Sequence, residues 1–414
     1  MLDKAAREKI DYPILAIALF SLLYNAILAF INHNVMAMST SHVVLCEGAV
    51  LVASAIYLLR RGLYEEDAGL FLYLGFALVM ALYVMALNRM AFIDQFRNAL
   101  IIVCLAGLGS WANERTMRLV FGIGCLMVLV FLLCEIVSTE FYVALFHPGA
   151  YFENTRGIKQ VSFNHTGLFA NALGFEGRFS FGLIDHRSSS IFLEQVSLAN
   201  FCGVAVMYLL SFWERIGRAE RLLFLATIVL ILLTNDTRTM LIFSFVSIAG
   251  YFVFPRIPKT FDLALMPAII LVGFFVHLMK PNETGDNFTG RIGLTINKLL
   301  DLDFSAVLGL SVGRIAEFAD SGYPYLIYGS TLLGLIAFWL FVCLYPAGAS
   351  ARQRRLCHSL SLFIFLNMMI GGTAIFSMKI AGLLWLLVGY MRFADDPRAG
   401  RQDLADVASG GVPA

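Results

Sequence analysis

Long apolar runs alternate with short polar connections along almost the whole chain. A helix needs about 20 mostly apolar residues to cross a bilayer, and fewer suffice where it packs inside a bundle. The pattern therefore predicts an all-α polytopic membrane protein with about twelve transmembrane helices. The predicted spans are 12–31, 42–59, 70–87, 98–112, 119–138, 191–213, 222–234, 240–254, 261–279, 323–346, 359–373 and 379–393.

Two connections are much longer than the others, namely 139–190 and 280–322, and both hold basic residues, carboxylates, aromatics and glycines. Five predicted spans precede the first loop and nine precede the second, so both loops are expected on the same face of the bilayer. Residues 1–393 are expected to form a single transmembrane domain. The segment 394–414, rich in Asp, Arg, Gly and Pro, predicts a disordered cytoplasmic tail.

The distribution of Lys and Arg predicts the orientation of the spans. With both termini cytoplasmic, the inner segments hold eighteen of the 30 basic residues and the short outer loops hold four. Because cytoplasmic segments carry the excess of Lys and Arg, we expect both long loops to be extracytoplasmic. Composition agrees with a membrane protein, since 59% of residues are hydrophobic, 14% are charged and the mean hydropathy is +0.78. A net charge of +1 offers no bulk basicity for nucleic acid.

Neither metal nor cofactor chemistry is predicted. The seven cysteines include no CxxC pair, none lies in a long loop, and no pair of histidines has the spacing of metal ligands. GxSxG, HExxH and Walker sequences are absent from the chain, which removes support for hydrolase and ATPase functions.

The first candidate segment lies at the end of loop 139–190. Arg187 is followed by three serines and then by Ile-Phe-Leu before Glu194 and Gln195, at the start of a predicted span. Charges are costly in hydrocarbon and are often functional there, so Arg187 is predicted to bind phosphate and Glu194 to face a polar cavity. The alternative is an interfacial arginine with a paired glutamate. His186, Arg156 and Arg178 of the same loop are further candidates for substrate binding.

Two other segments predict anion-binding groups. In the turn 234–239, Asp236 and Thr237 can cap the next helix, and Arg238 can share an anion with the N–H groups of that helix; the alternative is a simple polar hairpin. Loop 280–322 has apolar residues at helical spacing over 290–302, which predicts a short amphipathic helix along the membrane surface. Its candidate site residues are Arg291, Arg314, Asp320 and the neighbouring Tyr323.

Together these segments resemble the superfamily of bacterial O-antigen polymerases and ligases, and most closely exopolysaccharide polymerases of the xanthan-polymerase kind. Arg187–Gln195 is similar to the family's arginine followed by Phe-Leu-Glu-Pro, with glutamine in the proline's place. The turn 234–239 resembles its Ser-Arg-Thr turn, and Gly290-Arg291 and 308–313 resemble its Gly-Arg and Gly-x-Gly elements. Ligases have a histidine near the position of Asp320, so a ligase is less expected here.

The resemblance implies a metal-independent glycosyltransferase of the bacterial inner membrane, whose substrates are oligosaccharides linked to polyprenyl pyrophosphate. Arg187, Arg238 and Arg291 are then expected to clamp the pyrophosphate, with Arg314 as the next candidate, while Glu194 or Asp320 orients or deprotonates the acceptor hydroxyl. It also implies membrane lipid, a chain-length regulator and a flippase of the same pathway as partners. The alternatives are a flippase, an O-antigen ligase and, more weakly, an O-acetyltransferase.

Overall fold

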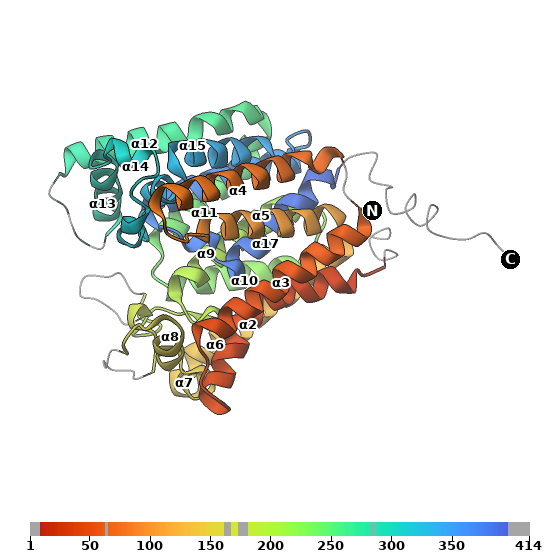
Figure 1. The fold of residues 1–414 in the computed structure, drawn as a ribbon. Coiled ribbons are helices and arrows are strands. Elements are labelled where there is room, and N and C mark those ends of the chain that lie inside the picture. Colours follow the sequence, from red (N-terminus) through yellow and green to blue (C-terminus); the bar gives the residue numbers. More distant parts are fainter. Residues whose placement is uncertain are drawn as a thin grey trace.

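The computed structural model describes residues 9–62, 65–160, 167–172, 181–281, 283, 285 and 287–395, and all regular secondary structure in these residues is helical (Figure 1). This confirms the predicted all-α class, and each of the twelve predicted spans falls on a helix. Those helices are α2 (Tyr12–Asn34), α3 (Thr40–Arg61), α4 (Ala68–Asn88), α5 (Asp94–Trp111), α6 (Glu114–Val137), α9 (Gln195–Phe212), α10 (Arg218–Thr234), α11 (Arg238–Val253), α12 (Asp262–Met279), α15 (Gly322–Leu344), α16 (Ala351–Ile370) and α17 (Met378–Phe393).

Eight helical segments in the described part of the chain are long and apolar enough to cross a membrane. They contain α2, α3, α4, α6, α9, α11, α12 and α15. The other four predicted spans are shorter or more polar: α10 and α17 have 17 and 16 residues, α5 begins at Asp94, and α16 begins with several basic residues. The structure is thus consistent with a polytopic membrane protein, while the count of twelve spans stays a prediction.

Helices α5 and α17 form the tightly packed centre of the bundle and lie side by side in Figure 1. Two glycines allow this approach. A Cβ atom on Gly389 would lie 1.9 Å from the carbonyl oxygen of Ala106, and one on Gly109 would lie 2.1 Å from that of Leu386. Small residues permit such backbone contact between membrane helices, so these glycines determine the spacing of α5 and α17.

Burial separates inner helices from outer ones. In the most apolar stretch of α9, 94% of the residues are buried, whereas the value is 17% for both α4 and α12. On α12 the exposed residues include Leu271, Val272 and Phe275. Continuous apolar surface of this kind is unfavourable in water, and it suits helices that face lipid.

The two ends of the bundle differ in their polar structure. At one end, where α9 and α17 finish, Arg352 of α16 donates to the carbonyl oxygen of Ser211 at 2.7 Å and pairs with Asp395 at 3.0 Å. Asp395 belongs to the predicted tail 394–414, of which residues 396–414 lie outside the described part. At the other end, where α9 and α17 begin, the long loops fold into helices, seen toward the left in Figure 1: α7 (Thr139–Phe146), α8 (Pro148–Arg156), α13 (Phe288–Leu300) and α14 (Phe304–Val307).

Helix α13 covers most of the segment 290–302, for which the sequence predicts an amphipathic helix at the membrane surface. Its apolar residues Ile292 and Ile296 are buried in the main core, and α13 contacts α12, α15 and α16. The helix is present, but its apolar face packs against other parts of the protein. The apolar face of α13 packs into the core of the bundle instead of lying on the membrane surface, because α12, α15 and α16 lie next to it.

Candidate functional site

A cavity of about 1390 Å³ opens at the end of the bundle that carries both long loops. Its wall is built from α8 and the segment around Arg187 in the first loop, from the start of α13 and Asp320 in the second, and from the turn before α11. The first turns of α9 and α17, the last turn of α16, and parts of α2, α3 and α5 complete the wall. Segments far apart in the sequence therefore line one open cavity, which is large enough for a sugar–phosphate ligand.

The structure brings six of the predicted site residues to the lining of this cavity and leaves three elsewhere. The six are Arg156, Arg187, Glu194, Arg238, Arg291 and Asp320. The three that are not in the lining are His186, Arg314 and Tyr323. Arg178 lies outside the described residues. The predicted clamp arginines thus share one cavity, and their binding to a diphosphate stays a prediction.

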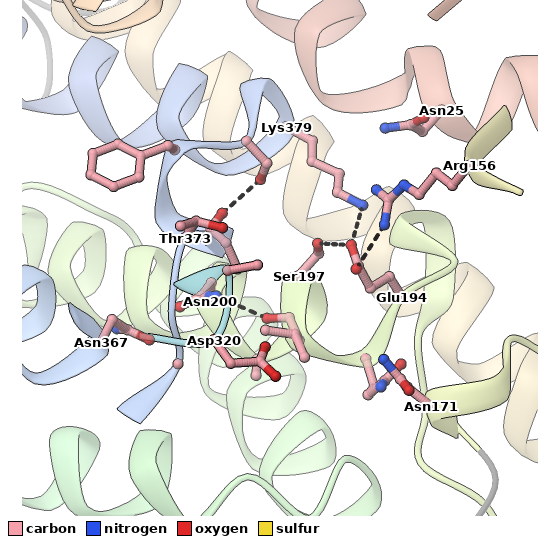
Figure 2. Close-up of a pocket in the computed structure, with 18 of the residues that line it drawn as sticks. Asn25, Arg156, Asn171, Glu194, Ser197, Asn200, Asp320, Asn367, Thr373 and Lys379 are labelled. Atoms are coloured by element: carbon pink, nitrogen blue, oxygen red, sulfur yellow. Dashed lines mark hydrogen bonds and ion pairs between the residues drawn. The ribbon is translucent and has the colours of Figure 1, made fainter. Parts of the chain in front are cut away.

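Glu194 forms the centre of a charged triad with Arg156 and Lys379. Nη1 of Arg156 donates to Oε1 of Glu194 at 3.1 Å, and Nζ of Lys379 donates to Oε2 at 3.0 Å. The hydroxyl of Ser197 also donates to Oε2, at 2.8 Å. Figure 2 shows Arg156, Lys379 and Ser197 pointing toward the carboxylate. Because two cations stabilise its charge and both of its oxygens accept hydrogen bonds, Glu194 is poorly suited to take a proton from a substrate.

The segment that carries Arg187 is bound directly to the turn that carries Arg238. Nε of Arg187 donates to the carbonyl oxygen of Asn235 at 2.8 Å, and the amide of Asn235 donates to the carbonyl oxygens of Ser188 and Gln195. These contacts place the two arginine motifs beside each other at the cavity wall. Their proximity arises because the buried Asn235 bonds to both ends of the segment 188–195.

The turn before α11 has the capping geometry that the sequence predicts. Oγ1 of Thr237 accepts from the N–H of Met240 at 3.4 Å, which makes Thr237 the N-cap residue. Arg238 follows as the first residue of α11, its side chain is 42% exposed, and its Nε lies 3.8 Å from Oδ1 of Asp236. The first turn of this helix and the Arg238 guanidinium are therefore both at the cavity wall, an arrangement that favours anions.

Arg291 and Asp320, both from the second long loop, form an ion pair at the cavity. Nη1 of Arg291 lies 3.3 Å from Oδ2 of Asp320, whose side chain is 70% exposed. The neighbouring Ala319 accepts a hydrogen bond from the N–H of Thr373 at 3.1 Å, which fixes this part of the loop to the end of α16. In Figure 2 Asp320 lies apart from the Glu194 triad, on the side of Asn367. Its exposure makes Asp320 the more accessible of the two predicted carboxylates.

The remaining three predicted site residues interact with other parts of the protein and not with the cavity. The hydroxyl of Tyr323 donates to the carbonyl oxygen of Phe365 at 2.8 Å in the core. Arg314 pairs with Glu317 at 3.1 Å and lines a separate, smaller cavity of about 320 Å³. His186 is buried against Glu135, and its Nε2 lies 3.3 Å from that carboxylate. The structure therefore does not bring these three side chains to the cavity, because the packing of each loop turns them toward other parts of the protein.

Five charged residues at the cavity were not predicted as site residues, namely Glu47, Asp94, Arg97, Asp236 and Lys379. Lys379 is 1% exposed, and Arg97 donates from Nε to the carboxylate of Glu47 at 2.9 Å. The hydroxyl of Tyr24 donates to the same carboxylate at 2.7 Å. Two of them could have been found from the sequence, because a charge inside or at the end of an apolar span is often functional, and Glu47 and Lys379 are such charges. In the sequence, Arg97 and Lys379 belong to the four basic residues of the predicted short outer loops and therefore contribute only to the predicted orientation.

The charges at the cavity nearly balance. Six cations and five carboxylates contribute to its lining: Arg97, Arg156, Arg187, Arg238, Arg291 and Lys379, with Glu47, Asp94, Glu194, Asp236 and Asp320. A site with paired charges can bind an anion if the ligand replaces an internal carboxylate, and the exposed Arg238 and the partly exposed Arg291 are accessible for such an exchange. The side chains of Asn25, Asn171, Asn200 and Asn367 add neutral hydrogen-bonding groups that suit sugar hydroxyls.

Comparisons of the chain with protein-family models, with curated proteins and with solved structures found no match. The likeness to polysaccharide polymerases therefore depends on the loop motifs of the sequence.

Proposed function

We propose that this protein is a membrane glycosyltransferase that polymerises oligosaccharides carried on polyprenyl pyrophosphate. The observation that carries the proposal is the single cavity shared by Arg187, Arg238 and Arg291 with the exposed carboxylate of Asp320. A diphosphate leaving group needs several hydrogen-bonding cations, and guanidinium groups offer bidentate contacts without a metal. The surrounding apolar helices suit a substrate with a lipid tail.

The proposed reaction joins two lipid-linked oligosaccharides. A sugar hydroxyl of one molecule attacks the anomeric carbon of the other, a new C–O bond forms, and the bond from that carbon to the pyrophosphate breaks. Asp320 takes the proton of the attacking hydroxyl, while the arginines stabilise the charge that develops on the departing pyrophosphate. Removal of one such stabilising donor typically costs about 3–4 kcal/mol of transition-state stabilisation.

The proposed roles divide between two carboxylates. Glu194 holds Arg156 and Lys379 in the wall, since both of its oxygens are engaged. Asp320 acts as the base, since its side chain is exposed and paired with Arg291. In this scheme Arg291 both orients Asp320 and contributes to the pyrophosphate clamp.

The proposal assigns the cavity to the outer face of the bacterial inner membrane. The excess of Lys and Arg in the predicted inner segments supports this orientation. Arg352 and Arg355 lie in the first turns of α16, whereas the cavity-lining residues of this helix lie in its last turn. An outer cavity meets lipid-linked units after they have crossed the membrane, as a polymerase requires.

The lipid-linked glycans of a strain that lacks this chain provide the test. We expect single repeat units to accumulate at the outer face, and the wild-type chain to restore long polymer. Arg187→Ala, Arg238→Ala and Arg291→Ala should each fail to restore it at normal protein level. Arg89→Ala is the matched control, because Arg89 is exposed and is not part of the cavity lining.

Other outcomes would contradict the proposal. Repeat units that stay at the inner face of the membrane would instead indicate a flippase, and complete polymer that fails to reach its final acceptor would indicate a ligase. Normal polymer in all three arginine variants would rule out the clamp.

A further inference from the structure

Glu135 is a fully buried carboxylate in the last turn of α6. The most apolar stretch of α6 has a mean hydropathy of 2.7, so the charge stands at the end of a strongly apolar helix. An ionised carboxylate without partners is very unfavourable in such surroundings. The partners of Glu135 therefore indicate what the residue does.

The carboxylate of Glu135 binds the short segment 186–190 of the first long loop. Oε2 accepts from the N–H of Ser190 at 2.7 Å and from that of Ser189 at 3.0 Å. Oε1 accepts from the N–H of Ser189 at 3.1 Å and lies 3.3 Å from both its hydroxyl and Nε2 of His186. One side chain thus satisfies two successive backbone N–H groups that would otherwise be buried without a partner.

The backbone held by Glu135 has an unfavourable conformation. Ser190 has φ +48° and Leu193 has φ +62°, and neither is a glycine. Residues in the left-handed region are strained unless they are glycine, and they persist where the surrounding structure stabilises them. The hydrogen bonds from Ser189 and Ser190 to Glu135 supply that stabilisation at the centre of the turn.

Arg187 lies between this anchor and a second one. On the other side, the N–H of Ser188 donates to the carbonyl oxygen of Thr234 at 3.1 Å, and Nε of Arg187 donates to that of Asn235. Arg187 lines the cavity, whereas Glu135 and the three serines do not. Glu135 therefore does not reach the cavity itself, but the segment that it holds does.

We infer that Glu135 is a positioning residue, which holds segment 186–190 in the conformation that presents Arg187 to the cavity. The functional part of this inference rests on the proposed polymerase activity, in which Arg187 stabilises the leaving pyrophosphate. Glu135 itself touches no substrate. Its loss moves the guanidinium of Arg187 and lowers the rate of the chemical step.

The test compares purified variants in proteoliposomes supplied with lipid-linked oligosaccharide. Glu135→Gln keeps the size of the side chain but turns an NH₂ group toward one of the serine N–H groups. We expect its kcat to fall about 100-fold with little change in KM, because a displacement of about 1 Å at a reacting centre has an effect of this size. The exposed Glu140, five residues further on, provides the control Glu140→Gln, which should behave as the wild type.

A double variant distinguishes action through Arg187 from a general loss of structure. If Glu135 acts through Arg187, Glu135→Gln should have little further effect in the Arg187→Ala background, because residues that act as a unit are not additive. Independent, additive losses would overturn the inference, as would a wild-type kcat in Glu135→Gln.

A structural measurement keeps the test valid if activity is lost for other reasons. Trypsin should cleave after Arg187 faster in Glu135→Gln than in the wild type or Glu140→Gln, because the segment is no longer held. Ser189→Ala removes one contact to Glu135 but keeps its N–H, so it should fold and show a smaller effect. Unchanged cleavage would refute the anchor. Full activity in Arg187→Ala together with faster cleavage in Glu135→Gln would refute the proposed role of Arg187 alone.

Discussion

Nε of Arg187 donates a hydrogen bond to the backbone carbonyl oxygen of Asn235 at a distance of 2.8 Å. This bond joins two segments 48 residues apart, one before α9 and one between α10 and α11. It also holds one edge of the Arg187 guanidinium, and Arg187 is part of the cavity lining. The sequence predicts an anion site in each segment, and in the structure both segments line the same cavity.

Asn235 should be essential for the stability of this junction. Asn235→Ala removes the amide bonds to the carbonyl oxygens of Ser188 and Gln195 and keeps the backbone oxygen that accepts from Arg187. A buried polar group left without its partner costs about 1–3 kcal/mol. Thermal unfolding of the detergent-solubilised protein should therefore occur at a lower temperature. The exposed Asn297 gives the control Asn297→Ala, and equal unfolding temperatures for the two variants would contradict the prediction.

The pair of Glu194 and Lys379 should show strong energetic coupling. Lys379→Met leaves Glu194 with one cation fewer, and Glu194→Gln leaves a buried ammonium with reduced compensation. Breaking a buried pair by removing one partner typically costs about 3–5 kcal/mol. The double variant should be less destabilised than the sum of the two single variants. Chemical or thermal unfolding of the four proteins measures this difference, and simple additivity would show that the pair is not coupled.

His186 should make the stability of the protein fall as pH rises above the pKa of an unfolded histidine. Burial lowers the pKa of His186, but the hydrogen bonds and charges of Glu135 and Asp185 outweigh it, so the pKa is raised. The folded protein then holds this proton more tightly than the unfolded chain does. The stabilisation is complete below the unfolded pKa of about 6.5 and is lost as pH rises through the folded pKa.

Unfolding temperatures at about pH 5.5 and at several higher pH values test this prediction, because the pKa of the unfolded histidine is about 6.5 and the folded pKa is higher. The wild type should lose more stability between them than His186→Gln does. Glu140→Gln serves as a control with a nearby exposed residue. An identical pH dependence in wild type and His186→Gln would exclude a protonated His186 as the source.

The sequence was sufficient for the helices because each apolar run is long and is bounded by polar or glycine-containing turns. Every predicted span therefore falls on a helix, and Thr237 caps α11 as predicted. Local pattern carries this information, since hydrogen bonding within a helix and a local cap involve residues only a few positions apart.

Partners across the bundle could not be predicted in the same way. Glu47 and Arg97 are 50 residues apart, and Glu194 and Lys379 are 185 apart. Whether a loop residue such as Tyr323 faces a cavity or the core depends on neighbours from other helices, which here bury it against Phe365. Ser190 likewise has a left-handed conformation and donates its N–H to the distant Glu135, and the serine sequence carries no signal of either feature.

The contact between α5 and α17 predicts a strong effect of a single methyl group. In Gly389→Ala, the new Cβ would lie 1.9 Å from the carbonyl oxygen of Ala106 if the backbone did not move. The two helices must therefore separate. Overpacking of this kind costs about 1–3 kcal/mol or more. Gly122 in α6 has open space around the same position, so Gly122→Ala should be neutral or slightly stabilising. The amount of folded protein in the membrane and its unfolding temperature distinguish the two variants.

Asp320 rather than Glu194 should carry the proton transfer of the proposed reaction. Asp320→Asn keeps the shape of the side chain and a hydrogen-bonding group for Arg291 but removes the basic oxygen. Positioned general bases contribute about 10²–10⁴-fold to rate, so kcat of the purified protein should fall within this range. Glu317→Gln is the matched control, because Glu317 is an exposed carboxylate of the same loop and pairs with Arg314 away from the main cavity. If Asp320→Asn keeps its activity while Glu194→Gln loses it at normal unfolding temperature, the roles of the two carboxylates are reversed.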